Sequence, residues 1–167
     1  MGLGGRLTEP SYVRALGLFH GLWTPTEEAI ARWSVGRDVR WPLEGRARLA
    51  RHDLLVLGVS AAAISELPCC DVERLDPGAE GAATAFGYAY VLEGSARGAA
   101  VIARRLADEL PEAPDSFLAS REPGRWPAFK KSLDQQAWSE ASQERAADAA
   151  NRLFAALTAI ASGAPGA

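Results

Sequence analysis

The chain has 167 residues, of which 48% are hydrophobic and 23% are charged, and its formal net charge is −3. This length suits one domain around one core, and the composition is that of a globular protein. The small negative charge excludes a global basic field for nucleic acid, and the longest apolar run, residues 54–64, is too short to span a bilayer. Residues 1–10 lack the apolar core of a signal peptide. We therefore expect a cytoplasmic protein without nucleic-acid or membrane partners, folded as a single domain over residues 1–167.

The first predicted element is a helix that follows Thr8, a good N-cap residue. Aromatic and apolar residues then recur at helical spacing, namely Tyr12, Leu16, Phe19 and Trp23. Pro25 should kink this helix or restart it with Thr24 as a new N-cap, because proline removes a backbone donor. The second piece should end near Trp33.

A loop and two shorter helical segments should come next. Glycine, proline and several charges predict a loop over residues 35–44. Residues 46–57 should form a second helix, and the stretch to Leu67 a further turn. Cys69 and Cys70 are adjacent, which is not the spacing of a structural zinc site. A strained vicinal disulfide is one alternative, and two reduced thiols at a helix end after Pro68 are the interpretation we favour.

The second half of the chain is also predicted to be helical. A turn at residues 76–78 precedes the longest helix, over residues 80–110. A short element at residues 114–118 and a helix over about 126–138 should follow, and Ser139 should cap the last helix. The apolar face of that last helix consists of Ala146, Ala149, Leu153, Ala156, Leu157 and Ile160.

No segment shows the alternation typical of a strand, and no internal repeat or linker is visible. Residues 162–167 should form a frayed tail. The sequence therefore predicts an all-α fold of about six to eight helices.

Three glycines lie at helical spacing within residues 80–110. Gly87, Gly94 and Gly98 are seven and four residues apart, so they should form one bare stripe, which Tyr90 and Val91 flank. Each glycine in a helix interior costs about 0.5–1 kcal/mol relative to alanine. Two explanations are open: close packing against another helix, or a backbone laid against a flat ligand that a side chain would exclude.

The common catalytic motifs are absent from the sequence. It contains no P-loop, no GxGxxG and no GxSxG. The two histidines, His20 and His52, leave little room for a catalytic triad, and neither has a glutamate three positions before it, as di-iron carboxylate bundles require. The sequence therefore offers no metal-ligand set.

The segment YVLEGSARGAAVIARRL, residues 90–106, resembles the distal helix of bacterial heme oxygenases, especially the biliverdin-forming type associated with bacteriophytochromes. That family has a similar run of Tyr-Val-x-Glu-Gly-Ser, then a second glycine and an apolar and basic tail. Three other segments are similar to family helices in the same order: LTEPSYVRALGLFHGLWTPTEEAI (7–30), RLARHDLLVLG (48–58) and GRWPAFKKSLD (124–134). The resemblance covers most of the chain.

The resemblance implies the all-α heme-oxygenase fold, with heme between a proximal and a distal helix. It implies oxidative opening of heme to biliverdin with release of iron and carbon monoxide, using O₂, electrons from an unidentified external reductase, and a bacteriophytochrome system as partner. Gly94 and Gly98 would line the distal face, and the catalytic role of Ser95 would be a distal water relay through its hydroxyl. The other implied heme contacts are Tyr90, Val91, Arg97 and Lys130, the last two through the propionates.

The resemblance also implies where the iron ligand should be. In the family it is a histidine on the first helix, upstream of the segment similar to residues 7–30, so we expect this chain to lack the proximal helix. His20 should be a packed helix residue and His52 a surface residue, so neither inherits the ligand role. Three explanations stay open. The first is a shortened chain, and the second is a degenerate homologue that binds heme weakly, binds a bilin or binds neither. The third is recruitment of His20 as the ligand.

Three functions are therefore compatible with the sequence. The first is a heme oxygenase, the second a non-catalytic tetrapyrrole-binding or regulatory protein, and the third an unrelated helical interaction domain whose glycines serve close packing. An open cleft beside Gly94 and Gly98 would favour either of the first two. A cleft filled by a neighbouring helix would exclude both.

Overall fold

The computed structural model describes residues 6–35, 45–75, 79–120 and 124–163, without the side chains of Ala79 and Arg97. Within these ranges the chain forms helices and no strand, which confirms the predicted all-α fold. The seven described helices are α1 (Glu9–Ser34), α2 (Arg46–Val56), α3 (Ala61–Ser65), α4 (Ala79–Glu109), α5 (Ser116–Ala119), α6 (Arg125–Asp134) and α7 (Glu140–Ser162).

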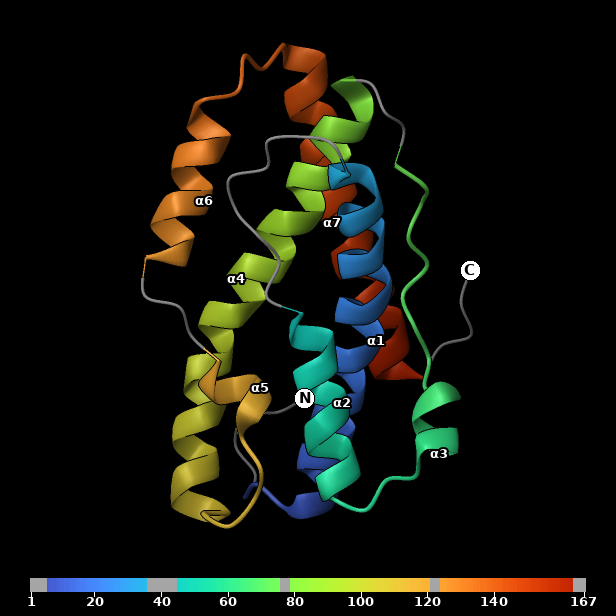
Figure 1. The fold of residues 1–167 in the computed structure, drawn as a ribbon, viewed down its shortest axis with the longest axis vertical. Coiled ribbons are helices and arrows are strands. Elements are labelled where there is room, and N and C mark those ends of the chain that lie inside the picture. Colours follow the sequence, from blue (N-terminus) through green and yellow to red (C-terminus); the bar gives the residue numbers. More distant parts are fainter. Residues whose placement is uncertain (1–5, 36–44, 76–78, 121–123, 164–167) are drawn as a thin grey trace.

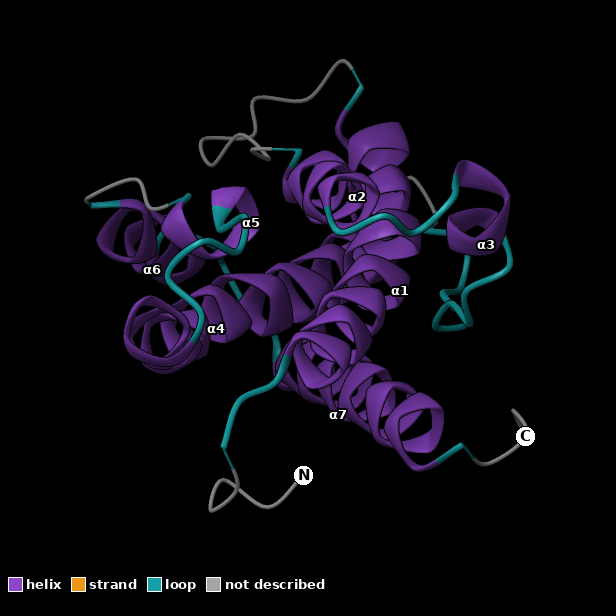
Figure 2. Ribbon diagram, turned by 90° about the horizontal axis from the view of Figure 1, so that it is seen from below, coloured by secondary structure: helices purple, strands orange, loops and turns teal. Residues whose placement is uncertain are grey.

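The long helices α4 and α7 form a diverging pair (Figure 1). They lie side by side where each begins, and they separate toward their C-terminal ends. Helix α1 packs against both, α2 packs on α1, and the short α5 contacts α2 and α4. Helix α6 lies beside α4 on the side away from α7 (Figures 1 and 2). This arrangement leaves part of α4 without α7 as a neighbour.

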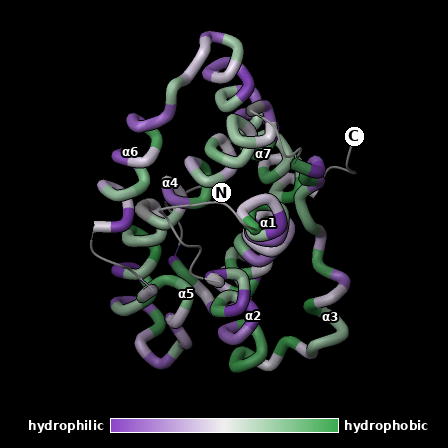
Figure 3. The backbone as a smooth tube through the Cα atoms, turned by 45° about the horizontal axis from the view of Figure 1, so that its top comes forward, coloured by the Kyte–Doolittle hydropathy of each residue, from purple (hydrophilic) through white to green (hydrophobic). Residues whose placement is uncertain are grey.

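The core lies between the inner faces of these helices. Its largest fully buried side chains include Trp23, Tyr12, Phe117, Phe129, Leu92 and Leu153. Figure 3 shows hydrophobic and hydrophilic residues alternating along the long helices, as in amphipathic helices that share a core. On α7 the predicted apolar face is confirmed, because Ala149 and Leu153 are buried and the other four residues are partly buried.

Pro25 does not restart α1, so the predicted break at Thr24 is wrong and the helix runs unbroken to Ser34. Proline cannot donate to the carbonyl four residues earlier, which is that of Gly21. The Cys70 N–H donates to this carbonyl instead, at 2.9 Å. Gly21 also permits the approach, because a Cβ there would lie 2.1 Å from the carbonyl oxygen of Pro68. The connection after α3 therefore supplies a hydrogen-bond donor to the Gly21 carbonyl, which has no helical donor because residue 25 is proline.

Most other helix ends follow the local sequence signals. Thr8 caps α1 and Ser139 caps α7, each by accepting the backbone N–H three residues later. Gly58, at φ 82°, follows the end of α2, as predicted. Helix α6, however, ends at Asp134 rather than near Trp138, whose indole N–H donates to the Leu133 carbonyl at 2.7 Å.

Several expectations concern residues outside the described ranges. These are the turn at 76–78, most of the loop at 35–44, the break around 121–123 and all but the first two residues of the expected tail. The division of the chain into a single domain stays a prediction. Cys69 and Cys70 are both free, the first exposed and the second buried. None of the described helices is long and apolar enough to cross a membrane.

Candidate functional site

The three glycines of α4 have different surroundings, so they do not form the one uniform stripe that their spacing predicts. A Cβ on Gly87 would lie 2.3 Å from the Ala146 carbonyl oxygen of α7, so this glycine serves close helix packing. A Cβ on Gly94 or Gly98 would meet no described atom within 4 Å. The divergence of α4 and α7 explains the difference. Close packing therefore accounts for Gly87 but not for Gly94 and Gly98.

The bare backbone belongs to a larger exposed surface of α4. Tyr90 is 47% exposed and Val101 is 58% exposed, and both are large hydrophobic residues. Their positions are three or four residues from Gly94 and Gly98, so all four lie on one side of the helix. We call Tyr90, Gly94, Gly98 and Val101 the open face. A flat apolar ligand can approach the backbone closely there, between an aromatic ring and an aliphatic side chain.

Ser95 and Val91 lie beside the open face but have different environments. The hydroxyl of Ser95 is partly buried and donates to the Leu92 carbonyl at 2.8 Å. Its proton is thus used within the helix, and its oxygen can still accept a hydrogen bond. Val91 is fully buried and belongs to the core. Arg97 lies between the two glycines in sequence, and its side chain is outside the description.

Helix α6 borders the open face through an ion pair and an aromatic contact. Arg125 makes a bidentate pair with Glu93 of α4, with the closest N···O distance at 2.7 Å and both side chains largely buried. Trp126 lies next to Tyr90, with 5.7 Å between ring centroids. Lys130 is exposed one turn further along α6. Sequence reasoning missed Arg125 and Trp126, because only the fold brings them to α4.

The two histidines lie on other helices, since α4 contains none. His20 is buried in α1, and burial together with the charge of Arg51 lowers the pKa of its imidazole. No hydrogen-bond partner for its Nδ1 is found among the described residues. His52 is exposed on α2, as expected. The open face thus fits a flat ring, but α4 itself offers no imidazole to an iron ion, and the described residues contain no metal-binding cluster.

A buried polar network holds α2 and α5 next to α1. The Glu27 carboxylate accepts the backbone N–H groups of Arg46 and Ala47, at 2.9 and 3.1 Å. Burial raises the pKa of the Glu27 carboxyl, and these N–H donors and the charge of Arg46 oppose that effect. At the other side, the backbone of Phe117 donates to Asp53 at 2.8 Å and accepts from Arg46 at 2.7 Å.

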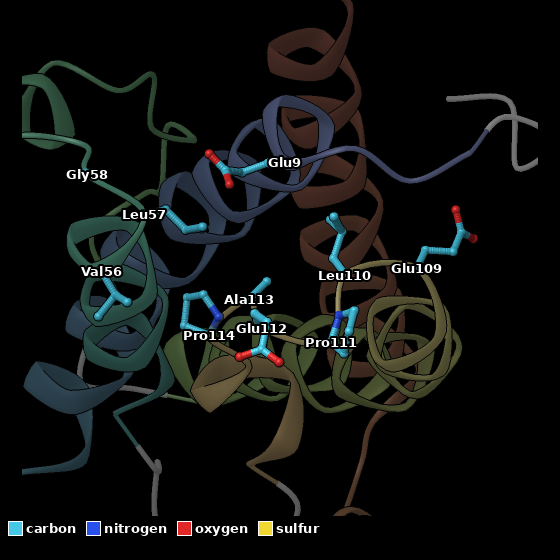
Figure 4. Close-up of a pocket in the computed structure, with 10 residues that line it drawn as sticks. All are labelled: Glu9, Val56, Leu57, Gly58, Glu109, Leu110, Pro111, Glu112, Ala113 and Pro114. Atoms are coloured by element: carbon cyan, nitrogen blue, oxygen red, sulfur yellow. The ribbon is translucent and has the colours of Figure 1, made fainter.

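A pocket of about 560 Å³ lies elsewhere, at the C-terminal end of α4 (Figure 4). Its lining residues include Glu9, Glu109 and Glu112. Glu109 is paired with Arg105 at 2.9 Å and accepts the Leu7 N–H, and these contacts lower the pKa of its carboxyl. Three carboxylates disfavour a ligand that itself carries carboxylates. We therefore place the candidate site at the open face.

Comparison with known proteins gives one family and one relative. The family model described as heme oxygenase matches residues 2–162. The curated heme oxygenase from Xanthomonas campestris pv. campestris (strain 8004) is 30% identical over 156 residues, which cover 90% of this chain and 88% of that protein. No solved structure matches the chain. The matched residues include all seven described helices, and therefore both the open face and α6.

Proposed function

Because the chain belongs to the heme oxygenase family, we propose that it binds heme against the open face of α4 and opens the ring oxidatively to biliverdin. Iron and carbon monoxide are the other products, and O₂ and an external electron donor are the co-reactants. The observation that supports this site is the empty space beside Gly94 and Gly98, where a Cβ would meet no described atom.

Each proposed site residue has a distinct role. Gly94 and Gly98 let the helix backbone approach the ring and leave room above its centre. The Ser95 oxygen accepts a hydrogen bond from a distal water, since its own proton goes to Leu92. Lys130 attracts a propionate, as does Arg97. Bound heme supplies the iron at which O₂ reacts.

Of the two residues expected to flank the ring on α4, Tyr90 is open to a ligand and Val91 is not. Tyr90 is exposed and can pack on the ring edge, whereas fully buried Val91 supports the helix from the core side. We keep Val91 in the set as a residue that fixes the position of α4. Contact with the ring then depends on Tyr90 and the two glycines.

A second candidate function is tetrapyrrole binding without turnover. The observation that favours it is the position of the two histidines, because His20 is buried in α1 and His52 is exposed on α2. Without an imidazole ligand, heme loses the group that tunes its iron and fixes its orientation. This chain would then hold heme or a bilin through the open face alone.

Hemin titration of the purified 167-residue chain, followed by ascorbate and O₂, separates these functions. A saturable Soret band that gives way to biliverdin absorption supports the oxygenase. A stable Soret band without biliverdin supports binding alone. No Soret change over free hemin would contradict both.

A matched pair of variants locates the site. Gly98→Leu places a side chain in the open face, and Ala107→Leu places the same side chain on the exposed, opposite side of α4. We expect Gly98→Leu to weaken hemin binding by about tenfold or more, which corresponds to about 1.4 kcal/mol. Ala107→Leu should bind hemin as the wild type does, and equal weakening by both would place heme elsewhere.

We also propose a cellular setting, supported by the similarity of residues 90–106 to oxygenases associated with bacteriophytochromes. The protein acts in the cytoplasm with an unidentified reductase, and its biliverdin serves a bacteriophytochrome. The product formed with hemin and ascorbate should assemble with a purified apo-bacteriophytochrome. Failure of the released pigment to give a photoactive holoprotein would contradict this setting.

A further inference from the structure

We propose that Trp126 contacts the bound tetrapyrrole, as part of an aromatic wall that Trp126 and Tyr90 build along one edge of the open face. The proposal rests on the proposed function, since it names a further contact of the same site. Helix α6 thereby supplies an aromatic contact to the ligand in addition to the proposed propionate contact of Lys130.

The position of the two rings is the first observation. Tyr90 is on the open face and 47% exposed, so Trp126 covers only part of it. The ring centroids lie 5.7 Å apart with planes inclined at 53°, and the indole itself is only partly buried. Both rings therefore keep apolar surface for a third group. Aromatic surface of this kind stacks favourably on the edge of a flat ring.

The attachment of α6 is the second observation. Arg125 directly precedes Trp126 and binds Glu93 through both carboxylate oxygens, with Glu93 3% exposed and Arg125 10% exposed. Phe129 is fully buried against Phe86, with 6.2 Å between centroids, which fixes the next turn of α6. A bidentate ion pair and a buried ring thus hold Trp126 from both sides, so its position does not depend on the ligand.

The chemistry along α6 is the third observation. Lys130 lies four residues after Trp126, so both side chains project from the same side of the helix. An indole surface followed by an exposed ammonium matches a ligand with a flat apolar ring and a carboxylate at its rim. Porphyrins with propionates and linear tetrapyrroles both have this pattern, and the test below treats them separately.

The test compares Trp126→Leu and Trp126→Phe with the wild type in hemin and biliverdin titrations. We expect Trp126→Leu to weaken hemin binding about tenfold, because stacking surface is lost, and Trp126→Phe to restore most of the affinity. The induced circular dichroism of the Soret band should also change in Trp126→Leu, because it reports aromatic rings close to the heme. If Trp126→Leu weakens biliverdin binding as much as hemin binding, the aromatic wall contacts the product as well.

Trp138→Phe is the matched control. Trp138 follows the end of α6 at Asp134 and contacts Phe86 edge-on, with 5.2 Å between ring centroids. Its replacement should leave hemin affinity and the Soret dichroism unchanged. Far-ultraviolet circular dichroism confirms folding, and if Trp126→Leu fails to fold, Trp126→Phe with its smaller ring still has to shift the Soret dichroism.

The outcomes distinguish this inference from the proposed function. If the wild type binds hemin and both Trp126 variants bind it with wild-type affinity and dichroism, the wall is wrong and the proposed site stands. If the wild type does not bind hemin, both are wrong. Loss of affinity in Trp138→Phe equal to that in Trp126→Leu would also overturn the wall, since it would indicate a general packing effect.

Discussion

Single glycines on α4 show how the same residue type has opposite roles within three helical turns. Gly87 permits contact with the α7 backbone, whereas Gly94 and Gly98 face open space. The sequence predicts that the three share one side of a helix, because spacing defines direction. It does not predict which neighbour occupies that direction, because the divergence of α4 and α7 depends on the whole fold.

Alanine substitutions should separate these roles. Gly94→Ala should raise the free energy of unfolding by about 0.5–1 kcal/mol, because alanine is the better helix former and its Cβ meets no described atom. Gly87→Ala should lower it, because its Cβ would lie 2.3 Å from the Ala146 carbonyl oxygen. Urea denaturation of both apo-variants measures the difference. Destabilisation by Gly94→Ala would show that another part of the chain covers this position.

His20 should make stability depend on pH. Burial, assisted by the charge of Arg51, lowers the pKa of His20 in the folded chain. The unfolded chain takes up this proton near pH 6.5, and the folded chain does so only at lower pH. Below about pH 6.5 protons therefore favour the unfolded state, so the free energy of unfolding should fall as the solution is acidified.

The measurement is urea denaturation between pH 5 and 8 for the wild type, His20→Gln and His52→Gln. In His20→Gln the free energy of unfolding should decrease less on acidification than in the wild type. His52 is exposed on α2, so His52→Gln should keep the wild-type slope. The raised pKa of the Glu27 carboxyl means that its protonation favours the folded state, so this group opposes the loss of stability on acidification. All three proteins share this contribution, so the difference between them reports on the histidines.

Helices α1, α2 and α7 show two kinds of N-terminal cap, one next to the helix in sequence and one distant from it. Thr8 and Ser139 are local caps, and both could be predicted from the residue type and the pattern that follows. Helix α2 begins after Gly45, which has no capping side chain, and Glu27 of α1 accepts its first N–H groups instead. A cap separated by 19 residues has no local signal.

Removal of this distant cap should therefore be costly. Glu27→Ala leaves one buried and one partly buried N–H group without this acceptor, so the free energy of unfolding should fall by about 2 kcal/mol or more. Glu28→Ala is the control, because Glu28 is exposed and its ion pair with Arg32, at 3.6 Å, lies on the surface. Its effect should stay within about 0.5 kcal/mol. Thermal and urea denaturation check both, and equal effects would mean that Glu27 does not hold α2.

The extents of α1 and α6 show where element prediction fails. Pro25 predicts a break because proline removes a donor, but a distant N–H replaces it and α1 continues. Helix α6 stops before Trp138 although its residue pattern would allow another turn, and the indole N–H donates to the Leu133 carbonyl at 2.7 Å. In the candidate site, Tyr90 and the glycines were predicted from α4 alone. Trp126 was not, since it reaches α4 from another helix.

The whole molecule is organised by the divergence of α4 from α7, which leaves the second half of α4 with fewer neighbours. Ligand binding at the open face should therefore protect a defined part of the molecule. In hydrogen–deuterium exchange, hemin should slow exchange in residues 90–101 of α4 and in α6, with little change in α7. Protection confined to the residues around the pocket that Glu9, Glu109 and Glu112 help to line would place the ligand at the C-terminal end of α4 instead.

The hydrogen bond from the Cys70 N–H to the Gly21 carbonyl, which Pro25 leaves without a helical donor, makes these three positions depend on one another. Replacing Pro25 by alanine would return a helical donor to the Gly21 carbonyl, which Cys70 already uses. A side chain at Gly21 would meanwhile push away the Pro68 carbonyl. Substitutions at these positions should therefore be strongly epistatic: the effect of each depends on which residues occupy the others. Any sequence change that shortens or redirects the connection after α3 would turn Pro25 from a tolerated residue into a helix breaker.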